Sequence, residues 1–116
     1  MSLDEQLVGR VRTALGGRRD LVESAEFGGL AFIHKGHIAC VVIGDEILVH
    51  VKPEDYDEAL TREGARPAVF EGRPLKGMLS VRREGIRTRH RLERWTRDSL
   101  AFVATLADKR KKPFVP

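Results

Sequence analysis

The sequence predicts an α+β fold, in which a curved antiparallel sheet packs against three helices. The expected order is helix, three or four strands, helix, two strands, helix. Apolar residues recur at helical spacing near both ends of the chain. Between them, β-branched runs alternate with two-residue turns that contain glycine, which is a strong hairpin signal. Connections this short imply antiparallel neighbours and leave the helices to pack on the sheet.

Length and composition indicate one domain that spans residues 1–116, with residues 109–116 as a basic tail. The chain has 116 residues, of which 41% are hydrophobic and 33% charged, enough apolar material for one core. Its single cysteine, Cys40, excludes an intramolecular disulfide and a thiolate metal site. The polar N-terminus does not resemble a signal peptide, and no apolar run is long enough to span a bilayer. We therefore expect a cytoplasmic protein that does not contact the membrane.

The first helix is predicted from a capping box, Ser2-Leu3-Asp4-Glu5, in which the Ser2 hydroxyl caps the helix. Leu7, Val11 and Leu15 continue its apolar stripe, and Gly16-Gly17 ends it. Residues 21–25 are compatible with a short edge strand, and Phe27-Gly28-Gly29 with a turn.

The sheet is predicted from strands over residues 30–34, 37–43 and 46–51, joined by turns at Lys35-Gly36 and Gly44-Asp45. A second helix begins at Pro53 and ends at Gly64. Two short strands over 67–71 and 77–82 follow, with residues 72–77 as the loop between them.

The third helix is predicted to begin after Thr88 as its cap and to end in Lys109-Arg110-Lys111-Lys112. Its inward stripe comprises Leu92, Trp95, Ser99, Phe102, Val103 and Leu106. The middle strands are apolar on both faces, because Ile38, Cys40 and Val42 alternate with Ala39, Val41 and Ile43. One face fits under the helices, and the other must be covered by sheet curvature, a helix or a second subunit. A homodimer is one expectation from this pattern.

The order and spacing of several motifs resemble the N-terminal domain of the TfoX/Sxy family over nearly the whole chain. The motifs are Phe27-Gly28-Gly29-Leu30-Ala31-Phe32, Gly36-His37-Ile38-Ala39, Leu48-Val49-His50-Val51, Gly64-Ala65-Arg66-Pro67, Phe70 to Gly77, and the Leu92/Trp95 helix. The resemblance implies an α+β domain with a curved antiparallel sheet. It also implies a regulatory role, since two-domain members regulate natural competence together with a cyclic-AMP-responsive transcription factor. This chain departs from the family pattern at Glu26, where Met is common, and at His50, where Arg is common.

Two segments are candidates for contact with a ligand or partner. Arg73 and Lys76, on the predicted loop, could hold a phosphate or a carboxylate. Phe27, Gly28 and Gly29 could approach a ligand closely, because glycine lacks a side chain. For each segment a purely structural turn is the alternative, and the sequence favours it.

The last third of the chain carries the excess of positive charge. Residues 1–81 have 10 basic and 13 acidic side chains, whereas residues 82–116 have 11 basic and 4 acidic ones, a net charge of +7. Basic stripes are typical of nucleic-acid binding, and the candidates are Arg87, Arg91, Arg94, Lys109 and Lys111. Acidic residues interrupt the run, so a solvated face or an acidic protein partner are the alternatives.

No spacing in the sequence predicts catalysis, a metal site or a cofactor. Cys40 lies in an apolar run, and His34, His37 and His50 have no carboxylate at a familiar ligand spacing. The family resemblance and the sheet that is apolar on both faces together favour a non-enzymatic regulatory domain that binds another protein or itself. Weak nucleic-acid binding and binding of a small anion are the alternatives.

Overall fold

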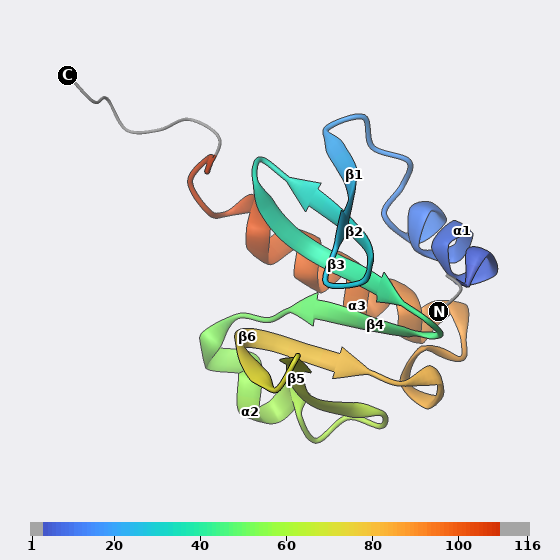
Figure 1. The fold of residues 1–116 in the computed structure, drawn as a ribbon, viewed down its shortest axis with the longest axis vertical. Helices are drawn as coiled ribbons and strands as arrows, with labels where there is room; N and C mark the ends of the chain where they lie inside the picture. Colours follow the sequence, from blue (N-terminus) through green and yellow to red (C-terminus); the bar gives the residue numbers. More distant parts are fainter. Residues whose placement is uncertain (1–3, 110–116) are drawn as a thin grey trace.

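The computed structural model describes residues 4–109 and contains a single six-stranded antiparallel sheet with helices packed against it (Figure 1). The helical elements are α1 (Glu5–Ala14), η1 (Pro53–Asp55), α2 (Tyr56–Ala59), η2 (Arg83–Ile86) and α3 (Arg89–Ala104). The strands are β1 (Leu21–Glu26), β2 (Gly29–His34), β3 (His37–Ile43), β4 (Glu46–His50), β5 (Ala65–Phe70) and β6 (Arg73–Val81). The predicted α+β class and the antiparallel sheet are confirmed.

The strand order is β1-β2-β3-β4-β6-β5, so the first four strands form a meander and β6 lies between β4 and β5. Tight turns at Phe27-Gly28, Lys35-Gly36 and Glu71-Gly72 each place both residues at positive φ, the conformation that matches the twist of a hairpin. The segment at residues 21–25 is confirmed as an edge strand, one residue longer than predicted.

One face of the sheet packs against α1 and α3. Phe32, Cys40, Val42 and Val49 are buried there, together with Leu7 and Val11 of α1 and Leu92, Trp95 and Val103 of α3. Figure 1 shows α3 crossing behind the middle strands, with α1 beside it. The 3.6-residue spacing of apolar side chains on both helices produces this layer.

The middle of the opposite face is covered by curvature of the sheet itself. Ala31 and Val41 are fully buried on it, and Leu48 is only 5% exposed. The turn before β2 and the end of β5 come together, because the rings of Phe27 and Phe70 contact edge to face with centroids 5.2 Å apart. Sheet curvature, one of the three alternatives, therefore buries the middle of the second apolar face, whereas Ile33, Ile38 and Ile43 stay partly exposed. The homodimer stays a prediction.

Several predicted boundaries are wrong. The cap of α1 is Asp4, since its carboxylate accepts a hydrogen bond from the Leu7 amide at 3.0 Å, and the predicted cap, Ser2, lies outside the described residues. The second helix is only a 3₁₀ turn followed by the four residues of α2. Residues 73–77 are not a loop but the first half of β6, and Glu71-Gly72 is the turn.

The start of the third helix agrees with the prediction. The Thr88 hydroxyl accepts a hydrogen bond from the Arg91 amide at 3.1 Å and caps α3. The helix ends earlier than expected, at Ala104. Chain beyond it packs against the β2–β3 turn, where the Lys109 amide donates to the Lys35 carbonyl oxygen at 2.9 Å.

Candidate functional site

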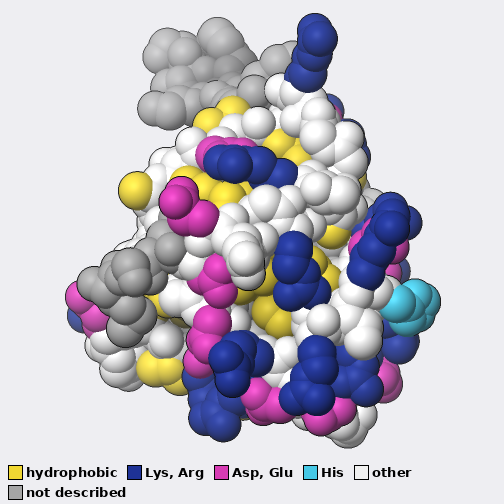
Figure 2. Space-filling view, turned by 90° about the vertical axis from the view of Figure 1, so that its right-hand side faces the viewer, with side chains coloured by type: hydrophobic (Ala, Val, Ile, Leu, Met, Phe, Trp, Pro, Cys, Tyr) yellow, Lys and Arg dark blue, Asp and Glu magenta, His cyan; other side chains and the backbone are white. Residues whose placement is uncertain are grey.

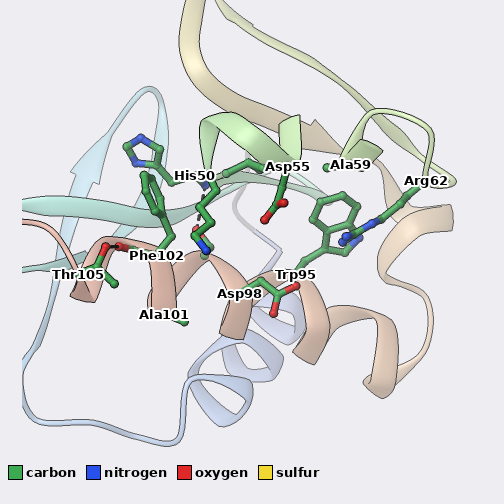
Figure 3. Close-up of a pocket in the computed structure, with 12 residues that line it drawn as sticks. His50, Asp55, Ala59, Arg62, Trp95, Asp98, Ala101, Phe102 and Thr105 are labelled. Atoms are coloured by element: carbon green, nitrogen blue, oxygen red, sulfur yellow. Dashed lines mark hydrogen bonds between the residues drawn. The ribbon is translucent and has the colours of Figure 1, made fainter. Parts of the chain in front are cut away.

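A cavity of about 370 Å³ opens between α3 and the segment that joins β4 to α2 (Figure 3). One wall comes from His50, Val51, Lys52, Asp55, Ala59 and Arg62, and the other from Trp95, Asp98, Ser99, Ala101, Phe102 and Thr105. Its volume lies in the lower part of the range of about 300–1,000 Å³ that is typical of small-ligand sites.

Ser99 fixes the floor of this cavity. At the Phe32–Ile33 step of β2, strand β3 carries one extra residue, Ala39, as a bulge. The buried Ser99 hydroxyl donates to the carbonyl oxygen of Ala39 and accepts a hydrogen bond from the His50 amide at 2.9 Å. One side chain of α3 therefore satisfies backbone groups of both β3 and β4.

His50 is held in a defined orientation at the same end. Its Nδ1 lies 3.1 Å from the carbonyl oxygen of Ile38, so Nδ1 carries a proton and donates it. The ring also packs edge to face against Phe102, with centroids 5.4 Å apart. The Nε2 atom faces Gly77, where an added Cβ would be 3.5 Å away.

Trp95 and Arg62 form the opposite end of the cavity. The guanidinium carbon of Arg62 lies 4.8 Å from the centroid of the Trp95 ring, a cation–π contact. Arg62 also forms a two-pronged ion pair with Glu58, with N–O distances of 3.2 and 2.8 Å. The hydrogen bond from Arg62 holds the pKa of the Glu58 carboxyl below its ordinary value.

Three charged side chains of the cavity have no such partner. Figure 3 shows Asp55 and Asp98 entering from opposite walls. Within residues 4–109, no hydrogen bond or ion pair reaches the side chain of Lys52, Asp55 or Asp98. The cavity therefore presents two carboxylates and one ammonium group that are available to a ligand.

A second, larger hollow of about 700 Å³ runs between α1 and α3. Its lining residues are Gln6, Gly9, Arg10, Thr13, Ala14, Arg89, Leu92 and Glu93, and we call it the α1–α3 groove. Figure 2 shows the side of the molecule that carries α1, with hydrophobic side chains exposed between basic and acidic ones. Arg10 is fixed at this groove by hydrogen bonds to the carbonyl oxygens of Ile86 and Arg87, at 2.6 and 3.4 Å.

Gly9 is unusual because it lies in the middle of α1 without a packing reason. A Cβ added there would have no atom within 4 Å. Glycine in a helix interior costs about 0.5–1 kcal/mol relative to alanine. The residue thus keeps open a stretch of the α1–α3 groove at the expense of helix stability.

The Phe27-Gly28-Gly29 segment has clear structural duties. Gly28 has a φ of 78°, and Phe27 adopts a φ of 55° that is rare for a bulky residue. A Cβ on Gly29 would lie 2.1 Å from the carbonyl oxygen of Val42, so only glycine fits there. These residues form the β1–β2 turn and the contact with Phe70, and they line neither the cavity nor the groove.

Arg73 and Lys76 are exposed on the outer half of β6. Neither side chain has an ion pair among the residues that the structure describes. Because the segment is a strand and not a loop, the expected glycine-bounded loop around an anion is absent from it.

The predicted basic set is divided by the fold. Arg91 is neutralised by Glu63 at 2.7 Å and also donates to the Glu84 carbonyl oxygen at 2.8 Å. Arg87 precedes α3 and lines a hollow together with Arg10, whereas Arg94 lies beside Trp95. Lys109 bonds through its backbone to the β2–β3 turn, and Lys111 lies outside the described residues.

Groups that could support covalent or metal chemistry are not brought together. Burial raises the pKa of the Cys40 thiol to about 12, so the thiolate nucleophile is not formed at neutral pH. Over residues 4–109, no three His, Cys, Asp or Glu side chains are placed to hold a metal ion. No helix in the same range is long and apolar enough to cross a bilayer.

These features define an α+β domain with a curled six-stranded sheet and surface hollows on both sides of α3. The family model for the TfoX N-terminal domain matches residues 14–103, and the chain belongs to this family. Searches of curated proteins and of solved structures found no match. Most of α1, including Gly9, precedes the matched residues.

Sequence reasoning did not identify Gly9 or the charged residues Lys52, Asp55 and Asp98 as functional. Gly9 carried a usable signal, since it interrupts the helix away from either end. The three charged residues carried none, because they are brought to one cavity only by the packing of α3 on β4.

Proposed function

We propose that this chain is a non-enzymatic, cytoplasmic regulatory domain that binds another protein through the α1–α3 groove. The open side of Gly9 is the observation that carries the proposal, because a helix retains a destabilising glycine where another molecule must approach closely. Membership of the TfoX N-terminal domain family supports a regulatory role.

The groove suits an apolar segment with an acidic side chain at one end. Leu92 and Ala14 are buried at its base. Arg89 at one edge is paired with Glu93, whereas Arg10 at the other has no ion pair among the described residues. Contacts of an apolar centre with a charged rim are typical of protein interfaces. The cyclic-AMP-responsive transcription factor that acts with two-domain relatives is the first partner to test, and a second copy of this chain is the alternative.

Substitution of Gly9 separates folding from binding. We expect Gly9→Ala to raise the free energy of unfolding by about 0.5–1 kcal/mol, as measured by urea titration. Gly9→Leu should fold and yet weaken partner binding at least tenfold, because its side chain occupies the groove. Binding is measured by calorimetry with the purified transcription factor, and self-association by sedimentation of the chain alone.

Arg73→Ala and Lys76→Ala serve as the matched comparison. They remove exposed cations of β6 that do not line the groove, so the affinity for the partner should be unchanged. If these variants lose the partner while Gly9→Leu retains it, the interface is the β5–β6 hairpin and the groove proposal is wrong.

The basic C-terminal third supports a second candidate, weak nucleic-acid binding. Its net charge favours this function, and the side chains of Arg87 and Arg94 have no ion pair within residues 4–109. Several neighbouring arginines are already neutralised, namely Arg83 by Asp45, Arg89 by Glu93 and Arg91 by Glu63. A complex with duplex DNA whose affinity falls steeply with salt would establish this function, and Arg87→Ala with Arg94→Ala should then weaken it.

A further inference from the structure

We propose that the cavity between β4 and α3 binds a small zwitterion of amino-acid size, with its ammonium group on Asp55 and Asp98 and its carboxylate on Lys52. The cavity shares no residue with the α1–α3 groove, so this inference does not depend on the proposed protein interaction. Its experimental failure would leave that proposal standing.

The unpaired charges are the first argument. The other charged side chain that lines the cavity, Arg62, is paired with Glu58 at 2.8 Å. Asp55 and Asp98 lie on opposite walls and have no partner in the described range. Two carboxylates that line one cavity suit a ligand ammonium group, since charge-assisted hydrogen bonds are stronger than hydrogen bonds between neutral groups.

Lys52 supplies the second point of recognition. It lines the same cavity and makes no ion pair with Asp55 or Asp98, so its ammonium group is available for an anionic group of the ligand. A simple amine would leave Lys52 unused, and a simple carboxylate would meet two like charges. A ligand that carries both groups complements all three side chains.

Aromatic walls and a rigid floor set the size and class of the ligand. Trp95 and Phe102 offer apolar surface for an aliphatic side chain, and Ser99 and His50 are fixed by hydrogen bonds to the sheet. A volume of about 370 Å³ holds an amino acid or a dipeptide but not a larger peptide or a nucleotide chain. Preformed sites of this type lose little affinity to rearrangement.

Trp95 is the only tryptophan in the chain, so its fluorescence reports directly on the cavity. The probes are the standard amino acids other than tryptophan and tyrosine, each added to the purified full chain at constant pH. For any amino acid that changes the emission, the N-acetyl and methyl ester derivatives are compared, because each lacks one of the two charges. Calorimetry provides the Kd.

We expect at least one free amino acid to bind, and both derivatives to bind at least tenfold more weakly. For Asp98→Asn, the free amino acid should bind no more tightly than its N-acetyl derivative. For Lys52→Gln, it should bind no more tightly than its methyl ester. Asp57→Asn, an exposed carboxylate of α2 that does not line the cavity, is the control and should bind as the parent chain does.

Two results would overturn the proposal. The absence of any emission change or heat with the whole panel would show that the cavity does not bind amino acids. Equal binding of the ester and the free amino acid would show that Lys52 plays no part and that the site takes a simple amine.

Discussion

Ser99 joins three parts of the molecule with one hydroxyl group. It lies on α3, donates to the Ala39 carbonyl oxygen at the β3 bulge and accepts from the His50 amide of β4. Without it, two buried backbone groups would lack a partner. An unsatisfied buried polar group costs about 1–3 kcal/mol.

Ser99→Ala is therefore expected to lower the free energy of unfolding by about 1–3 kcal/mol, measured by urea denaturation. Thr105→Ala is the control, because its hydroxyl bonds to the Phe102 carbonyl oxygen at the exposed end of the same helix. The variant at Thr105 should change stability by less than about 0.5 kcal/mol, as surface substitutions do. Equal effects at the two positions would show that the bridging role of Ser99 contributes nothing.

At this scale, helical spacing correctly placed Leu92, Trp95, Ser99 and Val103 on the buried side of α3. It could not reveal what Ser99 bonds to, because the bulge that exposes the Ala39 carbonyl oxygen depends on the pairing of β2 with β3. The cavity charges were unpredictable for a similar reason, since Lys52 and Asp98 are far apart in the chain.

Hairpin turns are the elements that the sequence specifies most strongly. Lys35-Gly36 was predicted, and the structure confirms it with φ values of 50° and 84°. The Glu71-Gly72 turn was missed, because Pro74 and Gly77 in the following segment favour a loop. Proline is accommodated in β6 because β4 pairs only with residues 78–81, so the first half of β6 has one free edge.

Glu71 occupies a positive φ of 51°, which favours asparagine over glutamate. We expect Glu71→Asn to raise the free energy of unfolding by about 0.5–1 kcal/mol, a magnitude typical of substitutions that suit the local backbone conformation better. Thermal and urea unfolding measure the effect. Glu71→Gln controls for the loss of charge and should give no gain, and a gain of the same size there would rule out the backbone explanation.

The curl of the sheet determines the shape of the whole molecule. Two apolar faces were evident from the alternation in the middle strands, and one of them was assigned correctly to the helices. Which feature covered the second face could not be derived, because the contact of Phe27 with Phe70 joins residues that are remote in the sequence and belong to different hairpins.

A double-mutant cycle on Phe27→Leu and Phe70→Leu tests this closure. Aromatic pairs contribute about 0.5–1.5 kcal/mol beyond the burial of their area, so we expect a coupling energy of that size in urea unfolding. Additive effects within about 0.3 kcal/mol would mean that the two rings act independently. The sheet would then be curved by its backbone alone.

The position of β6 between β4 and β5 has a consequence for how the chain folds. The β1–β4 meander and the β5–β6 hairpin each form from neighbours in the sequence. In contrast, β4 and β6 meet only after a long loop closes, since Glu46 and Ser80 at this junction are 34 residues apart. Loop closure must precede the contacts that compensate for its entropy. The β4–β6 ladder is thus the step that unites two locally formed sheets, and its formation closes the connection that carries Lys52 and Asp55 of the cavity.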